Sequence, residues 1–321
     1  MTRILNLKTA LAALLMLFGN LAAAQETTLN AVLFVPRNTT FGEIFVRFVE
    51  QTNKEGKGLV QIKLVGGPDA IPTFEQGNAV KNGVIDMASV APTFYTNFCP
   101  ECDAQILVPL QTPQLKKTKF WTVLEKYTNQ KVNAHLLSSY GDGIGFHIWT
   151  SKPPTGGTLK GMRLRTTPNY APLFSVLGVS QVQTAPGEVL TALERGVVDG
   201  YGWPAIGMFD LGWGQYTKYR IDPGFYNVIV NVVVNLDKWR SLRRDQRAFL
   251  AKMAGWLEAE NVRWVAERKA ADEKKIKDAG IQIVDLGPAH RKAAYDAYWD
   301  VLAKRAPEPT RELRAASDAL R

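Results

Sequence analysis

Two arginines stand two positions apart in the segment MRLRT, residues 162–166. Successive side chains of a β-strand face opposite sides, so Met162 and Leu164 are expected to pack inward while Arg163 and Arg165 share the other side. A guanidinium group donates two parallel hydrogen bonds to one carboxylate and cannot lose its charge. The chemistry that this segment suggests is therefore the capture of an anion.

The chain contains two cysteines, Cys99 and Cys102, in the loop sequence FCPECD. In an oxidising compartment a C-x-x-C pair can close a small disulfide that stiffens its loop, and we favour this structural role. A zinc site would need two further ligands, and the three histidines show no ligand spacing. A redox-active pair would need a helix directly after the first cysteine, where no convincing helical pattern occurs. We expect no metal and no cofactor.

An internal repeat organises the chain. Residues 78–86 read NAVKNGVID and residues 191–199 read TALERGVVD, so each copy has a helical end, a glycine and a short apolar strand that closes on an aspartate. Two copies of one α-to-β step predict two similar α/β lobes. The loops that follow, residues 91–97 and 200–207, are expected to point into a shared crevice at the carboxyl ends of the strands.

The remaining pattern divides the chain between these lobes. A β-branched run at residues 225–235 is long enough to cross from one lobe to the other. The helical stretch at residues 244–279 would extend about 50 Å and lie across both lobes. We expect residues 27–146 plus about 233–268 to form the first lobe, and residues 147–232 plus about 269–321 the second.

The amino terminus predicts export. Arg3 and Lys8 precede an apolar run that ends in three alanines, which is typical of a signal peptide at residues 1–24. The formal charge is +9, and removal of that segment lowers it by two. Because Lys and Arg are spread along the whole chain, we expect a small anion and no nucleic acid as the partner, although a merely solvated basic surface explains the charge equally well.

The segment LKGMRLRTTPN, followed by PGEVLTALERGVVDG and Pro204, resembles the substrate-binding proteins of tripartite ATP-independent periplasmic (TRAP) transporters, the DctP-like group. The resemblance implies a type II-like periplasmic binding protein fold. It also implies a monomer that captures a carboxylate by cleft closure and delivers it to the small and large membrane subunits of a TRAP permease. In this family the second arginine of the strand pairs with the ligand carboxylate, and that position is Arg165.

Three polar ligand contacts of the family are replaced in this chain. Trp203 stands before the closing proline, where the family often has asparagine, and His147 takes the place of an arginine. Phe94 or Tyr95 takes the place of a first-lobe arginine. Aromatic rings gain little from hydroxylated sugar acids but bury apolar ligand bodies well. We therefore expect a carboxylate with an aromatic or apolar body, with the choice between mono- and dicarboxylate left open.

Further candidate contacts lie near the expected crevice. Tyr201 and Phe146 flank its loops, and Glu75 and Asn38 lie at the rim of the first lobe. For each aromatic residue, a place in the core is an equally good interpretation.

Two other functions use the same cleft. A periplasmic sensor would hand its closed form to a membrane receptor and would differ only in its partner. A hydrolase or isomerase would need catalytic groups, yet the chain has no G-x-S-x-G or H-E-x-x-H motif. Asp86 and Asp199 occupy the same place in the repeat, which indicates a role in the fold. We expect a binding protein and not an enzyme.

Overall fold

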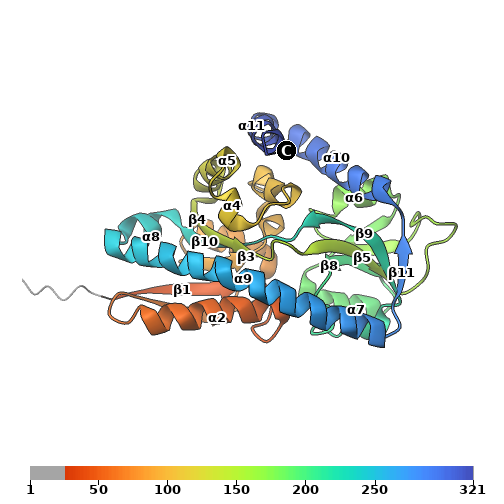
Figure 1. The fold of residues 1–321 in the computed structure, drawn as a ribbon, viewed down its shortest axis with the longest axis horizontal. Coiled ribbons are helices and arrows are strands. Elements are labelled where there is room, and N and C mark those ends of the chain that lie inside the picture. Colours follow the sequence, from red (N-terminus) through yellow and green to blue (C-terminus); the bar gives the residue numbers. More distant parts are fainter. Residues whose placement is uncertain (1–25, 321) are drawn as a thin grey trace, which may run out of the picture.

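The structure, a computed structural model, describes residues 26–320, so the expected signal peptide lies outside the described residues. Two β-sheets form the centres of two lobes joined by a long helix (Figure 1). This confirms the two-lobed α/β fold that the repeat and the resemblance predict. The helices are α2 (Thr40–Glu55), α3 (Gln76–Lys81), α4 (Thr112–Leu115), α5 (Lys119–Tyr127), α6 (Ala171–Val176), α7 (Val189–Glu194), α8 (Leu236–Ser241), α9 (Arg244–Asp278), α10 (Pro288–Arg305) and α11 (Pro307–Asp318).

The first sheet has the strand order β2-β1-β3-β10-β4. Its strands are β1 (Thr27–Leu33), β2 (Val60–Gly66), β3 (Met87–Val90), β4 (Ala134–Tyr140) and β10 (Val230–Asn235). Strand β1 pairs in parallel with β2 and β3, whereas β10 runs antiparallel to β3 and β4. The carboxyl ends of β1 and β3 therefore lie at one edge of the lobe, which is where ligands bind in α/β sheets.

The second sheet has the order β11-β9-β5-β8-β6-β7. Its strands are β5 (Gly145–Thr150), β6 (Arg163–Thr166), β7 (Ser180–Gln183), β8 (Gly200–Pro204), β9 (Tyr219–Asn227) and β11 (Gln282–Asp285). The chain returns to the first sheet after β9, and two residues, Val228 and Ile229, link β9 to β10. The β-branched run at residues 225–235 thus crosses between the sheets with a break at this link.

The repeated aspartates have the same role in both lobes. The Asp86 carboxylate accepts a hydrogen bond from the Asn30 backbone N–H at 2.8 Å, and the Asp199 carboxylate accepts one from the Arg163 backbone N–H at 3.0 Å. Each aspartate therefore ties the loop before its strand to a neighbouring strand. In the second lobe the Arg163 side chain also pairs with Asp199 at 2.9 Å, so this arginine serves the fold.

Replacing Asp199 by asparagine is expected to lower the free energy of unfolding by about 1 kcal/mol at pH 7, since its charged partners Arg163 and Lys152 are solvent-exposed. The hydrogen bonds from Arg163 hold the pKa of this carboxyl well below its usual range. The contribution of the Asp199 carboxylate to the free energy of unfolding is therefore complete above about pH 4 and is lost as the pH falls further. Urea unfolding at pH 7 and pH 3 measures this, with the exposed Asp278→Asn as control. Equal losses at both pH values would contradict the assignment.

The long helix α9 packs on both lobes. In the first lobe its Asn261 amide accepts from the Gly141 backbone N–H at 2.8 Å. In the second lobe its Asp272 carboxylate accepts from the Gly207 backbone N–H at 2.6 Å, and Glu273 pairs with Arg220 at 2.6 Å. Figure 1 shows the helix running along one side of both sheets. This agrees with the expected helix across both lobes.

The carboxyl-terminal helices differ from the expected lobe boundaries. Helix α10 packs on β9 and α6 of the second lobe, but α11 packs on α5 of the first lobe. The Tyr127 hydroxyl of α5 donates to Glu312 of α11 at 2.9 Å, and Leu313 is fully buried. The expectation that residues up to 321 belong to the second lobe is therefore wrong for α11.

Candidate functional site

A cavity lies between the two lobes, with a volume of about 40 Å³. That is room for about three water molecules at about 10–15 Å³ each. The first lobe contributes Phe34, Phe41, Ala91, Thr93, Phe94, Asp103 and Ile106, and the second lobe contributes Phe146, Arg165, Thr167, Asn169, Tyr170, Trp203 and Pro204. The link between β9 and β10 contributes Val228 and Ile229, and the start of β10 contributes Val230. The lining is mostly apolar with few polar groups, as is usual for a small-molecule site.

Arg165 is held rigidly at this cavity. It lies on β6, between β7 and β8, and only 1% of it is exposed. Its Nε and Nη2 donate to the Thr184 carbonyl at 3.1 and 2.9 Å, and Nη1 donates to the Gly202 carbonyl at 3.3 Å. A guanidinium has five N–H donors, so these bonds leave one N–H on each terminal nitrogen. Two free N–H donors on one guanidinium can serve the two oxygens of a carboxylate.

The charge of Arg165 has no acidic partner within the described part of the chain. No Asp or Glu carboxylate of residues 26–320 forms an ion pair with it, and its partners are neutral backbone carbonyls. Burial lowers the pKa of Arg165 to about 10, so the group stays cationic near neutral pH. A buried cation is costly unless an anion accompanies it. The site is thus built for an anion that comes from outside the chain.

Aromatic rings surround the cation. The ring centroid of Trp203 lies 5.9 Å from Arg165 Cζ, and the Trp203 ring meets Phe41 of the first lobe edge-on at 6.1 Å. Phe146 contacts Tyr170 edge-on at 5.3 Å. These rings offer an apolar surface to whatever part of a ligand lies beyond its carboxylate.

The two lobes also contact one another across the cavity. Thr93 follows β3 of the first lobe, and Asn169 follows β6 of the second. The Thr93 hydroxyl donates to the Asn169 side-chain oxygen at 3.2 Å and accepts from the Asn169 backbone N–H at 3.1 Å. Both residues are buried. The described conformation is therefore a closed one.

Replacing Thr93 by valine keeps the shape of the side chain but removes both cross-lobe hydrogen bonds. We expect about a tenfold loss of ligand affinity, because the closed form loses roughly 1.4 kcal/mol relative to the open form. Calorimetry measures the affinity, and small-angle scattering of the ligand-free protein measures the opening. The control is Thr96→Val, since the Thr96 hydroxyl bonds only within its own loop, to the Thr93 carbonyl. An unchanged affinity in Thr93→Val would show that these bonds do not govern closure.

The structure brings together four of the residues expected at the site: Arg165, Trp203, Phe94 and Phe146. Three others do not line the cavity. His147 Nδ1 lies 2.9 Å from an Asp222 carboxylate oxygen. The Tyr95 hydroxyl accepts from the Asn231 amide at 2.9 Å, and the fully buried Tyr201 bonds Thr217 at 2.6 Å. These polar groups bond within the protein, and the three residues lie outside the cavity lining.

The two expected rim residues also lie elsewhere. Glu75 accepts a hydrogen bond from the Asn78 amide at 3.0 Å, and Asn38 lines a separate surface groove beside α2. Neither lines the cavity between the lobes. The rim of the first lobe therefore adds no polar contact from these two positions.

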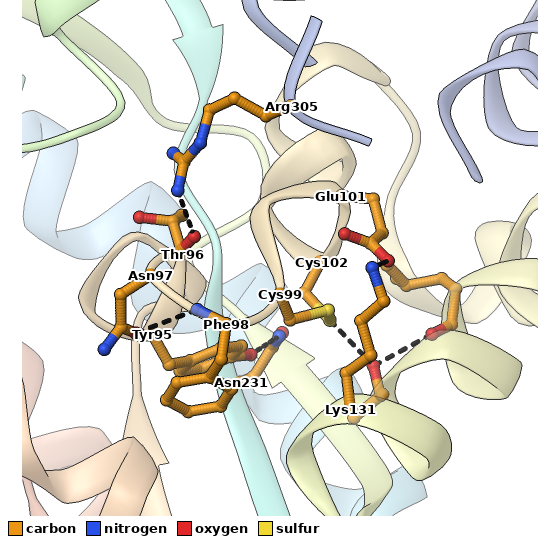
Figure 2. Close-up of a disulfide and its surroundings, with 12 residues drawn as sticks. Tyr95, Thr96, Asn97, Phe98, Cys99, Glu101, Cys102, Lys131, Asn231 and Arg305 are labelled. Atoms are coloured by element: carbon orange, nitrogen blue, oxygen red, sulfur yellow. Dashed lines mark hydrogen bonds and ion pairs between the residues drawn. A yellow bond between two sulfur atoms is a disulfide. The ribbon is translucent and has the colours of Figure 1, made fainter. Parts of the chain in front are cut away.

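The cysteines lie beside the site and not in it. Cys99 and Cys102 form a disulfide at the start of the 3-10 helix Pro100–Leu107 (Figure 2). Around it, Glu101 pairs with Lys131 at 2.5 Å and Arg305 donates to the Thr96 carbonyl at 2.6 Å. The bridge thus braces a segment that carries two cavity-lining residues.

Sequence reasoning missed several lining residues. Asn169 lies in the TTPN sequence directly after the arginine strand, and this position could have indicated it. Asp103 follows the second cysteine, and Tyr170 follows Asn169. An acid in a loop and an aromatic residue at a helix start carry no signal of burial in a cavity.

Two features are absent from residues 26–320. No helix in that range is long and apolar enough to cross a membrane. No group of three or more His, Cys, Asp or Glu side chains there could hold a metal ion.

The chain is similar in sequence to known bacterial solute-binding proteins. Residues 31–307 match the family described as bacterial extracellular solute-binding protein, family 7 (DctP). A monocarboxylate 2-oxoacid-binding periplasmic protein of Nostoc is 26% identical over 213 residues, which cover 62% of this chain and 56% of that protein. A solute-binding protein of Roseobacter denitrificans is 21% identical over 291 residues, which cover 88% of this chain and 89% of that one.

Two solved structures share the architecture. A TRAP periplasmic solute-binding protein of Desulfovibrio salexigens with bound orotic acid superimposes with a TM-score of 0.82 at 19% identity, covering 91% of this chain and 97% of that one. A Bordetella pertussis extracytoplasmic solute receptor that binds pyroglutamic acid gives a TM-score of 0.77 at 17% identity, covering 91% and 99%.

Proposed function

This chain belongs to family 7 of the bacterial extracellular solute-binding proteins, and we propose that it captures a monocarboxylate with a compact apolar or ring-shaped body. Members of this family are binding proteins and not enzymes. The observation that carries the proposal is the buried Arg165, which has two donors to spare and no acidic partner among the described residues. A carboxylate supplies the missing charge and matches the geometry of the two donors.

The cavity narrows the range of ligands. Its apolar lining disfavours sugar acids, whose hydroxyl groups would lose hydrogen bonds to water without replacement. The Nostoc relative is named for monocarboxylate 2-oxoacids, and two of the structural neighbours hold orotate and pyroglutamate. These ligands all combine a carboxylate with a small body.

Closure of the lobes makes capture selective. Arg165 and Trp203 belong to the second lobe, whereas Phe41 and Thr93 belong to the first. A ligand that contacts both sets favours the closed form by the contacts that exist only there. A shift from 1:99 to 99:1 needs about 5.5 kcal/mol of differential binding, which a charged hydrogen-bonded pair and buried apolar area together can provide.

The proposed function also includes delivery of the bound ligand to a membrane permease and a periplasmic location. The closed, loaded form docks on the small and large membrane subunits of a TRAP permease, and the protein acts as a monomer in the periplasm after removal of residues 1–24. The family match and the sequence of the amino terminus support this. Amino-terminal sequencing of protein recovered from the periplasm tests the cleavage, and co-purification with the permease tests the partner.

A thermal-shift screen of the mature protein tests the ligand class. The panel contains compact monocarboxylates (pyruvate, 2-oxobutyrate, pyroglutamate, orotate), dicarboxylates (malonate, succinate) and sugar acids (glucuronate, galactonate). We expect the largest stabilisation from the first group, since bound ligand raises stability by mass action. A sugar acid or a dicarboxylate as the strongest hit would reject the proposed class, and no hit among acids of any kind would reject carboxylate binding.

A further inference from the structure

A second ionisable group shares the cavity with Arg165. Asp103 lies on the 3-10 helix Pro100–Leu107, in the segment that the disulfide braces, and only 1% of it is exposed. The Tyr298 hydroxyl of α10 donates a hydrogen bond to its Oδ2. Its Oδ1 is buried and has no hydrogen-bond partner among residues 26–320. A buried carboxyl with one unused oxygen at a ligand cavity requires an explanation.

The neighbours of Asp103 leave it without a cation in contact. From α10, Arg305 acts on it only at a distance, because its guanidinium donates to the Thr96 carbonyl at 2.6 Å. Burial raises the pKa of Asp103 to about 7, against the opposing effects of the Tyr298 hydrogen bond and of Arg305. Tyr95 and Tyr226 also face it, and burial raises the pKa of both phenols, so they stay neutral.

The other charged groups nearby are already balanced or belong to the cavity. On the same 3-10 helix, Glu101 pairs with Lys131 at 2.5 Å. In the cavity lining, Arg165 is the only basic residue and Asp103 the only acidic one, and the buried Tyr170 is neutral because burial raises the pKa of its phenol. A ligand carboxylate neutralises Arg165, so an ionised Asp103 would then add a buried negative charge with no counter-ion. Such a charge is costly, and the group gains a proton instead.

We propose that Asp103 takes up one proton when a monocarboxylate binds and that its Oδ1–H donates a hydrogen bond to a second acceptor on the ligand, such as a keto or lactam oxygen. The proton comes from solvent and converts the carboxylate to a carboxylic acid. This inference rests on the proposed function, since it assumes a carboxylate on Arg165. It defines the ligand class further as monocarboxylates that carry a carbonyl oxygen in a compact body.

The proposal predicts affinity that depends on pH. A ligand that binds only the protonated form of Asp103 loses affinity as the pH rises through the pKa of the ligand-free group. With that pKa at about 7, affinity falls about tenfold between pH 6 and pH 8, and binding at pH 7 takes up about half a proton. A neutral His290 cannot cause this, because burial lowers its pKa to about 4.

The test is calorimetry of the mature protein with pyroglutamate, or with pyruvate if pyroglutamate gives no thermal shift, at pH 6, 7 and 8. Titration in phosphate, imidazole and Tris buffers yields the number of protons taken up. Asp103→Asn is neutral at every pH and keeps a donor amide, so we expect affinity independent of pH and no proton uptake. His147→Gln is the matched control, since His147 contacts Asp222 outside the cavity, and it should keep the wild-type pH dependence.

The outcomes separate the two proposals. Affinity that changes with pH in the same way in wild type and Asp103→Asn would overturn the role of Asp103 and leave the proposed function standing. An affinity that rises with pH in the wild type and is lost in Asp103→Asn would also overturn the role of Asp103 as a hydrogen-bond donor. In that case an ionised Asp103 would bind an amino group of the ligand. If no compact monocarboxylate of the thermal-shift panel binds, the proposed function and this inference both fail.

Discussion

Replacing Arg165 by methionine is expected to abolish carboxylate binding, with a loss of at least about 100-fold in affinity. Two hydrogen bonds between charged groups are lost, each contributing roughly 1.5–3 kcal/mol. The fold should survive with a change in unfolding free energy of no more than about 2 kcal/mol. The substitution leaves the carbonyls of Thr184 and Gly202 without their donors, which costs stability. It also removes a buried cation, and the desolvation cost that disappears with the cation offsets this loss. Calorimetry and urea unfolding measure the two effects.

Arg163 provides the matched control for this experiment. It lies on the same strand two residues away, but it is exposed and pairs with Asp199. Arg163→Gln should therefore lower stability slightly and leave affinity unchanged. Arg165→Lys keeps the charge but loses the planar pair of donors, so its affinity should fall between those of wild type and Arg165→Met. Wild-type affinity in Arg165→Met would falsify the assignment of this residue.

The parts of the fold that follow local rules could be predicted from the sequence. The glycine that ends each repeated helix was predicted correctly, since Gly83 and Gly196 both follow a helix and have positive φ. The position of the strand was predicted wrongly, because Asp86 and Asp199 come directly before β3 and β8 and do not close a strand. The alternation of apolar and basic residues correctly placed Leu164 in the core. Each of these signals arises within a few residues of sequence.

The parts that depend on distant contacts could not be predicted. His147 pairs with Asp222, and Tyr201 packs edge-on against Trp213 at 4.8 Å and bonds Thr217. His147 and Asp222 are brought together by the pairing of β5 with β9, and the partners of Tyr201 lie in the segment that joins β8 to β9, which no short pattern encodes. Position along a strand also decides whether a residue lines the cavity. Tyr201 and Trp203 share β8, but only Trp203 lies near the end of the strand that meets the cavity.

The packing of the last helix, α11, also could not be predicted from the sequence. Residues 307–318 are rich in charge, yet they form α11, whose buried face includes Leu313 and Ala316. The hydrophobic residues recur at helical spacing, but nothing in them specifies the partner. The contact between α11 and α5 depends on where α10 delivers the chain (Figure 1).

Replacing Trp203 by alanine is expected to weaken ring-bodied acids more than short ones. We expect at least about 100-fold for pyroglutamate or orotate, because truncation of a large buried aromatic side chain costs roughly 3–5 kcal/mol where the ligand packs on it. For pyruvate we expect about tenfold, which reflects the loss of the ring beside the Arg165 cation, whose Cζ lies 5.9 Å from its centroid. Affinities from calorimetry for the three acids give the comparison.

The difference between the affinity losses for the acids is the informative quantity, since two of the contacts of Trp203 affect the acids unequally. Its edge-on contact with Phe41, at 6.1 Å across the lobes, contributes to closure whatever the ligand. Contact with a ligand ring contributes only when a ring is present. Phe41→Leu weakens the contact across the lobes and keeps the Trp203 ring, so it should lower the affinity for all three acids and keep most of the preference for rings. Trp203→Phe should restore part of that preference. Equal losses for pyruvate and pyroglutamate in Trp203→Ala would assign Trp203 to closure and remove the argument for a ring-shaped ligand body.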